Sequence, residues 1–158
     1  MENLLKISYA VFNDWNQLQQ FLERKGNPRY ELVGNVNLDD RKDIFNLGNL
    51  VLVDGALSLS RSPIQSLGSL EYVGGYLDLK STPIESLGNL QYVGRYLDLV
   101  ETPIESLGNL EYVGGVLDLY KTSIKSLGNL EYVGDHIWLS KDHQIPKEQL
   151  IKFKIQYL

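Results

Sequence analysis

Three aspartates recur at an interval of twenty residues, and their spacing points more directly to chemistry than that of any other side chains. They are Asp78, Asp98 and Asp118, each set between two leucines. If successive strands stack in parallel, the three carboxylates form a column with a spacing of about 5 Å. Like charges at that spacing repel, which raises their pKa values or recruits a cation such as calcium or magnesium. No calcium-loop motif accompanies them, so we expect no metal cofactor and favour a solvated acidic ladder.

Aromatic or charged side chains occupy four of the six positions that lie two residues before or after these aspartates, and Val100 and Val116 occupy the other two. In the last repeat Trp138 takes the place of the aspartate. Exposed aromatic residues mixed with charged ones are typical of protein-binding hot spots, although aromatic pairs also stabilise neighbouring strands. We expect the following residues to bind a partner: Tyr76, Asp78, Lys80, Tyr96, Asp98, Asp118, Tyr120, His136 and Trp138.

The sequence does not favour catalysis or nucleic-acid binding. Its two histidines, His136 and His143, have no nucleophile or second base at a spacing that would activate them. No phosphate loop, dinucleotide fingerprint or zinc-ligand spacing is present, so we expect a protein that is not an enzyme. Residues 62–140 carry ten acidic and four basic residues. Because this net charge of −6 repels phosphate backbones, we do not expect nucleic acid as a partner.

The composition also bears on location. There is no apolar run of about 18 residues, so we expect no membrane-spanning segment and no membrane partner. The N-terminal residues lack the pattern of a signal peptide. The chain has no cysteine, whereas small secreted domains often depend on disulfides. We therefore expect a cytoplasmic protein.

A twenty-residue repeat must position these side chains. The four clearest copies are residues 62–81, 82–101, 102–121 and 122–141. A fixed period of this length is typical of a solenoid, because one unit is too small to bury its own apolar residues and must stack on its neighbours. Weaker copies extend the pattern backwards, so we expect one domain over residues 1–158 with repeats over residues 31–141.

Each repeat contains two leucines at a spacing of two, such as Leu77 and Leu79, which predicts a short strand with one buried face. The expected strands are residues 35–39, 56–60, 76–80, 96–100, 116–120 and 136–140. Stacked in parallel, these six strands form one ribbon-like sheet of a mostly β solenoid. Gly74, which recurs in every clear repeat, is expected to supply a positive φ at the corner before the strand.

A second column consists of Tyr72, Tyr92, Tyr112 and Tyr132, one in each clear repeat. Uniformity across repeats indicates a structural rule rather than a specific surface. We therefore expect these tyrosines to stack on one another, and we expect the more variable sheet face to bind the partner.

Solenoids need caps, because the last coil exposes apolar residues and unpaired strand edges. Within the expected N-terminal cap, residues 1–30, the segment 14–25 predicts a helix with an apolar face. Asp14 or Asn13 can serve as its N-cap. Pro146 begins the segment 146–157, for which the pattern predicts a second helix. That helix is expected to cover the final coil, so that residues 142–158 form the C-terminal cap.

These repeats resemble the leucine-rich repeat family in period and in the Leu-x-Leu strand. The string SLGNLEYVGGVLDL at residues 106–119 is similar to the L-domain type of receptor ectodomains, whose L-x-x-I-x-G-x-L-x-I repeats build a short right-handed solenoid. The resemblance covers about residues 31–141. It implies a right-handed parallel β-solenoid with a non-enzymatic binding surface.

The expected function is therefore that of an interaction module, either an adaptor or an inhibitor, which binds a protein on its outward sheet face. The alternative is a solenoid that binds a carbohydrate or another small ligand through the tyrosine, tryptophan and aspartate columns. A protein interface would need several columns at once, whereas a sugar site would depend on one or two aromatic residues.

Overall fold

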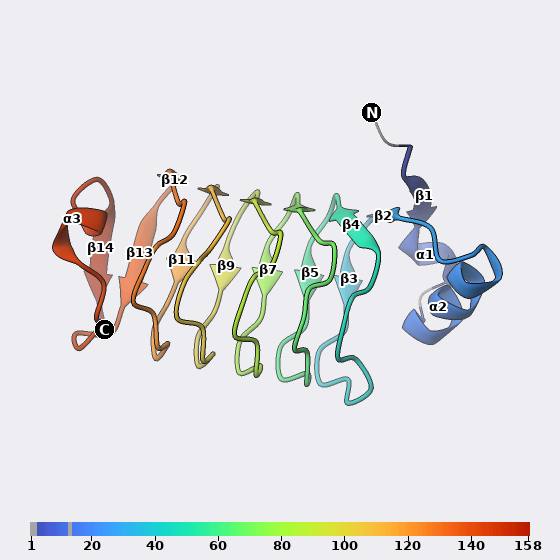
Figure 1. Cartoon of the computed structure of the whole chain (residues 1–158), viewed down its shortest axis with the longest axis horizontal. Coiled ribbons are helices and arrows are strands. Elements are labelled where there is room, and N and C mark those ends of the chain that lie inside the picture. Colours follow the sequence, from blue (N-terminus) through green and yellow to red (C-terminus); the bar gives the residue numbers. More distant parts are fainter. Residues whose placement is uncertain (1–2, 13) are drawn as a thin grey trace.

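Each repeat forms one coil, a single turn of a parallel β-solenoid, as the sequence predicts (Figure 1). The computed structural model describes residues 3–12 and 14–158. Each coil contributes two short strands that meet at a corner, and equivalent residues of successive coils pair in parallel at an interval of twenty residues. Leu77, for example, pairs with Leu97. The apolar residues of all coils point inward and form one continuous buried core.

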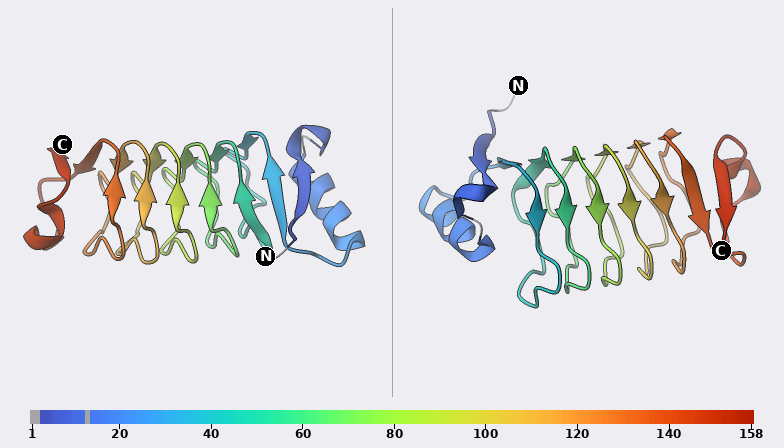
Figure 2. Two further views of the ribbon diagram at one scale, coloured as in Figure 1. Left: turned by 90° about the horizontal axis from the view of Figure 1, so that it is seen from above. Right: turned by 180° about the vertical axis from the view of Figure 1, so that it is seen from behind.

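The coils build two seven-stranded parallel sheets, not the single sheet that the pattern predicts. Sheet A contains β1 (Leu5–Ser8), β2 (Tyr30–Val33), β4 (Leu50–Val53), β6 (Tyr72–Val73), β8 (Tyr92–Val93), β10 (Tyr112–Val113) and β12 (Tyr132–Val133). Sheet B contains β3 (Val36–Asn37), β5 (Leu57–Ser58), β7 (Leu77–Asp78), β9 (Leu97–Asp98), β11 (Leu117–Asp118), β13 (His136–Leu139) and β14 (Lys154–Tyr157). The left panel of Figure 2 looks onto sheet A, and the right panel looks onto sheet B, which lies on the far side of the molecule in Figure 1.

The six strands expected from the leucine pairs are all present in sheet B, from β3 to β13. The middle ones are only two residues long because the chain turns away directly after the second residue. The strands of sheet A were missed for a related reason. In the clear repeats they consist of one outward tyrosine and one inward valine, which is too short for an alternating pattern to be recognised.

The corner glycines are required for a reason other than the positive φ that we expected. A Cβ atom on Gly94 would lie 2.1 Å from the carbonyl oxygen of Gly74, and one on Gly114 would lie 2.0 Å from that of Gly94. The backbones of adjacent coils therefore approach too closely for any side chain at this corner. Positive φ values occur instead in a different glycine column, which includes Gly88 at +58°.

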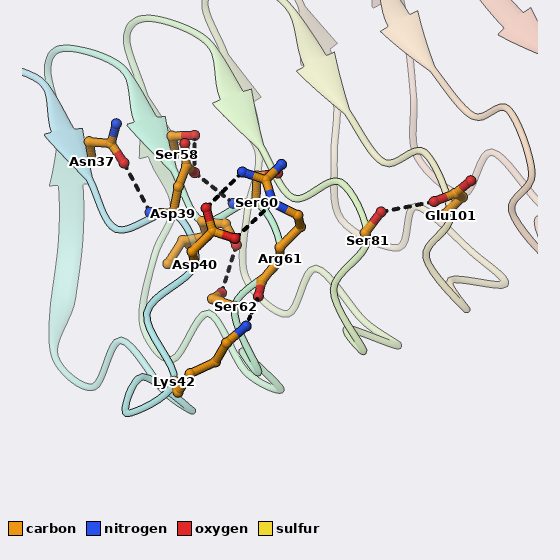
Figure 3. A network of polar contacts seen from close by, with 11 residues as sticks. Asn37, Asp39, Asp40, Lys42, Ser58, Ser60, Arg61, Ser62, Ser81 and Glu101 are labelled. Atoms are coloured by element: carbon orange, nitrogen blue, oxygen red, sulfur yellow. Dashed lines mark hydrogen bonds and ion pairs between the residues drawn. The ribbon is translucent and has the colours of Figure 1, made fainter.

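Another corner, directly after the strands of sheet B, has positive φ without glycine. Its residues are Asp40, Arg61, Ser81, Glu101 and Lys121, with φ between 55° and 59°. This conformation costs an ordinary L-residue about 1–2 kcal/mol. Contacts between coils tie these residues to one another. The guanidinium of Arg61 donates to both carboxylate oxygens of Asp40 at 2.8 Å, and the hydroxyl of Ser81 donates to Glu101 at 2.9 Å (Figure 3).

Two helices close the N-terminal end, α1 (Tyr9–Phe12) and α2 (Trp15–Arg24) (Figure 2). The predicted helix is confirmed as α2, and the side chain of Asp14 caps it by accepting from the backbone N–H of Asn16 at 2.9 Å. Asn13, the other expected cap, lies outside the described residues. Trp15 and its apolar neighbours on α2 are buried against the first coil. None of the helices within residues 3–12 and 14–158 is long and apolar enough to cross a membrane.

The C-terminal cap differs from the predicted helix over residues 146–157. Only α3 (Lys147–Leu150) is helical, and the chain then forms β14, which pairs in parallel with β13. Phe153 and Ile155 lie partly buried against the core at a spacing of two, whereas Ile151 is 83% exposed. The open edge of β13 offers backbone hydrogen bonds that a helix could not use, and this tertiary pairing overrides the local helical pattern.

Replacing Gly94 with alanine is expected to lower the free energy of unfolding by about 3 kcal/mol or more, because the added methyl group would collide with the backbone of the preceding coil. The matched variant Gly88→Ala places its methyl group 3.9 Å from the nearest atom. The methyl group of Gly88→Ala therefore meets no close neighbour, and only the positive φ of residue 88 disfavours alanine, by about 1–2 kcal/mol. Urea unfolding followed by circular dichroism measures both, and equal losses would contradict the crowding argument.

Candidate functional site

The outward face of sheet B brings together every side chain that we expected to bind a partner. Asp78 pairs with Asp98 across β7 and β9, Asp98 with Asp118 across β9 and β11, and Asp118 with Trp138 across β11 and β13. The predicted central column therefore exists in the predicted order. The flanking residues lie on either side of it, namely Tyr76, Lys80, Tyr96, Tyr120 and His136.

The aspartates do not form the solvated ladder that the sequence suggested. Asp98 is only 9% exposed and Asp118 only 5% exposed. One carboxylate oxygen of each accepts a hydrogen bond from the backbone N–H two residues further on, which belongs to Val100 at 2.9 Å and Tyr120 at 3.0 Å. Asp78 makes the equivalent contact. These aspartates therefore close the turn after each strand, a local bond that short acidic side chains make readily.

Tyr96 covers the two most buried carboxylates. Its hydroxyl lies 3.3 Å from Oδ2 of Asp98 and 3.2 Å from Oδ2 of Asp118. Because a phenol carries one hydrogen, the two carboxylates share a single donor. Burial raises the pKa of the Tyr96 phenol, and the two neighbouring carboxylates raise it further. Tyr96 is thus held by the acidic column and is half-buried rather than freely exposed.

The environment of the column disfavours ionised carboxylates. Burial raises the pKa values of Asp78, Asp98 and Asp118, whereas the backbone hydrogen bonds to their charged forms lower them in part. The charge of Asp118 adds to the increase at Asp98, and the ammonium of Lys80 opposes it. Among residues 3–12 and 14–158, no group of three or more histidine, aspartate and glutamate residues is placed to hold a metal ion.

Several aromatic side chains lie on the remaining surface of this face. Tyr76 is 44% exposed, and Tyr120 and Trp138 are half-buried. The ammonium of Lys121 lies 5.4 Å from the centroid of the Tyr120 ring, a cation–π geometry. His136 forms a contact with the carboxylate of Asp135, the residue before it.

A polar network borders the face on its N-terminal side and was missed from the sequence (Figure 3). Asp39 accepts from the hydroxyl of Ser58 and from the backbone N–H of Ser60, and Arg61 forms its two-pronged pair with Asp40. The partners lie 19–21 residues apart. The repeat period could have revealed these pairs, but this part of the chain follows the repeat only weakly.

The tyrosines of sheet A stack as predicted. The ring centroids of successive tyrosines are 4.4, 4.6 and 4.7 Å apart, and neighbouring planes differ by no more than 12°. We refer to these four residues, Tyr72, Tyr92, Tyr112 and Tyr132, as the tyrosine ladder. Their uniform stacking supports a structural role for the ladder.

Comparisons with known proteins were made at the level of sequence and of fold. No protein-family model, no curated protein and no solved structure matches this chain.

Replacing Asp118 with asparagine is expected to raise the free energy of unfolding at pH 7 and to weaken its dependence on pH. Since the folded-state pKa of Asp118 lies above its ordinary value of 3.8, the contribution of Asp118 to stability falls as pH rises from about that value through the folded-state pKa. An asparagine side chain does not ionise, and it keeps an oxygen that can accept the hydrogen bond from the backbone N–H of Tyr120. Urea unfolding between pH 4 and pH 8 measures the effect.

Asp43→Asn is the control with the opposite sign. The hydrogen bonds from Arg41 lower the pKa of Asp43 to about 2, so this pair stabilises the protein above the unfolded-state pKa and loses its effect as pH falls. The control should therefore be less stable than wild type at pH 7. If Asp118→Asn were also destabilising at every pH, the proposed burial penalty would be wrong.

Proposed function

We propose that the chain is a non-enzymatic interaction module of the leucine-rich-repeat type, which binds a protein partner on the outward face of sheet B. The supporting observation is the arrangement of that face. Tyr96 lies over the buried carboxylates of Asp98 and Asp118, other aromatic side chains lie on the same face, and the polar network around Asp39 and Arg61 borders it. An apolar and aromatic centre with a polar rim is the usual anatomy of a protein–protein interface.

The aromatic residues that are at least partly exposed on this face are the proposed anchors. Tyr76 and Trp138 present large rings with a polar end, the type of side chain that dominates binding energy at interfaces. Tyr96 is already held by Asp98 and Asp118. A side chain that is fixed before binding loses little conformational entropy on association, so preorganisation favours affinity.

The aspartates have a different role from the one first expected of them. Asp98 and Asp118 are too buried to make extensive contact with a partner. We assign them to positioning, because they hold Tyr96 and the turns after β9 and β11. The residues proposed to contact the partner are Tyr76, Lys80, Tyr120, His136 and Trp138, together with the outward edge of Tyr96.

A protein fits this face better than a sugar does. The proposed contacts extend from β7 to β13 across four successive strands of one sheet, a distance of about 14 Å at the usual strand spacing. Small ligands usually bind in concave sites that enclose most of their surface. A broad sheet face offers contact area rather than enclosure, which suits an adaptor or an inhibitor.

The test is affinity capture from host lysate with the tagged chain, followed by mass spectrometry and by affinity measurement with the purified partner. The variant Tyr76→Ser/Tyr120→Ser/Trp138→Ser is expected to weaken binding at least about tenfold, because aromatic anchors carry most of the energy of an interface. Tyr96 is left intact, since its loss would disturb the buried carboxylates.

The matched control replaces two exposed apolar residues away from sheet B, Val11→Ser and Phe45→Ser, which are 77% and 52% exposed. It should retain wild-type affinity, and both variants should keep the circular dichroism spectrum of wild type. Equal capture by all three proteins would refute the assignment of this face. If a glycan bound the wild-type protein but did not bind a variant in which Trp138 alone was replaced, the sugar-binding alternative would be favoured.

A further inference from the structure

The two sheets do not end at the same coil. At the C-terminal end, sheet B continues through β13 to β14, whereas sheet A stops at β12 (Figure 1). The chain that would form the next strand of sheet A instead turns into α3 and crosses directly to β14. The outer side of β12 is therefore an open strand edge. The preceding coils show which side chains and backbone groups pair at each position, and so indicate what would fit beside this edge.

The backbone of β12 offers hydrogen-bond acceptors in the register of the solenoid. In the preceding coil, the carbonyl oxygen of Glu111 accepts from the N–H of Tyr132 at 3.1 Å, and that of Val113 accepts from the N–H of Gly134 at 2.9 Å. Within residues 3–12 and 14–158, no backbone N–H donates to the corresponding oxygens of Glu131 and Val133. Unpaired groups of this kind are a template for another strand.

The side chains of β12 are also incompletely covered. Val133 is partly exposed, whereas the four valines before it in the same column, Val53, Val73, Val93 and Val113, are 0% exposed. Tyr132 is 48% exposed and is the last member of the tyrosine ladder, and among the described residues only the ring of Tyr112 stacks on it. An aliphatic side chain beside Val133 and a ring beside Tyr132 would complete both columns.

A negative charge without an ion-pair partner among the described residues, that of Glu131, also lies beside this edge. Glu131 follows Glu111 in register, and no lysine or arginine within residues 3–12 and 14–158 forms an ion pair with either. At the other end of the same column, Glu71 is paired with Arg29 at 3.0 Å. Elsewhere in the solenoid, opposite charges twenty residues apart pair directly, as Lys125 does with Glu105 at 2.7 Å. A cation beside Glu131 would complete this pattern.

A groove of about 360 Å³ lies next to the edge, between the last coil and α3. Its apolar lining includes Leu127, Leu130 and Ile151, and Lys152 and Glu148 also border it. Leu127 and Leu130 are buried, but Ile151 is 83% exposed and has little of the contact that its apolar surface would favour. The groove could receive an apolar side chain that precedes the strand.

We infer that the open edge of β12 binds an extended peptide segment of another protein with a basic–aromatic–aliphatic sequence, which adds to sheet A as its next strand. Strand addition of this kind takes affinity from main-chain hydrogen bonds and specificity from side-chain pairs. The three side chains would continue the columns of Glu131, Tyr132 and Val133. A second copy that pairs through its own β12 fits less well, because it would bring another Glu131 towards the first.

The test uses a fluorescein-labelled peptide with the sequence of residues 106–115 and the change Glu111→Lys, which reads SLGNLKYVGG. Fluorescence anisotropy should detect saturable binding to the full chain, at least about threefold tighter than binding of the unsubstituted peptide, because a lysine replaces a like charge beside Glu131. In the variant Glu131→Lys this preference should reverse.

The sharpest comparison uses the two ends of the tyrosine ladder. Tyr132→Ser should weaken peptide binding at least about tenfold, since it removes the ring on which the peptide would stack. Tyr72→Ser also removes one ring from the ladder, but at the end far from β12. It should change the affinity for the peptide less than about twofold. Trp138→Ser on sheet B should leave it unchanged, which separates this site from the partner-binding face proposed above.

Three outcomes would overturn the inference. The first is no anisotropy change with peptide at millimolar concentration. The second is equal weakening by Tyr132→Ser and Tyr72→Ser, which would indicate a general loss of stability. The third is a stable dimer in sedimentation experiments that the peptide cannot dissociate and that Tyr132→Ser disrupts, because the edge would then belong to a second copy.

Discussion

The parallel register of twenty residues between coils is the constraint on which the rest of the molecule depends. Each coil is too small to satisfy its own backbone, so its N–H and C=O groups bond to the coils on either side. In the clear repeats this register places each strand residue beside the residue twenty positions away. Leucine then packs on leucine and tyrosine stacks on tyrosine, at the cost of bringing carboxylates side by side. The same register explains the glycine corner, where two backbones approach too closely for a side chain.

The stacking of like charges is the main problem that this register creates, and the chain resolves it in two ways. On sheet B, Asp98 and Asp118 are buried and bonded to backbone N–H groups and to Tyr96. At the exposed corner, opposite charges alternate instead, as with Glu101 and Lys121 at 3.2 Å. The first solution makes the buried part of the acidic column part of the scaffold.

The two surfaces that we propose for recognition both lie where the chain departs from the repeat. The column that begins with three aspartates ends in Trp138, and the tyrosine ladder ends at a ring with one open face. Both occur towards the C-terminal end, where the period of twenty residues is lost and the cap closes one sheet but not the other. In a periodic structure the interior of each column is already occupied, so new contacts can form only where a column varies or ends.

Much of the fold could be predicted from the sequence, because periodicity and helix-capping signals are local. The repeat determined the solenoid, the positions of the strands in sheet B and the stacking of the tyrosines, and Asp14 with the apolar face that follows determined α2. The sequence also placed Asp78, Asp98, Asp118 and Trp138 in one column. It could not reveal that two of these carboxylates are buried, since their burial depends on Tyr96 and on the turns of neighbouring coils.

The second sheet and the C-terminal strand were decided only by tertiary contacts. The reason for the corner glycines also became clear only from the tertiary structure. Sheet A is defined by two-residue contacts between coils, which leave almost no alternating pattern within one repeat. Residues 154–157 form a strand because β13 presents an open edge, although their local pattern also suits a helix. The sequence alone determined what repeats, whereas the end of the repeat, and with it the open edge of β12, was decided by hydrogen bonds between residues far apart in the chain.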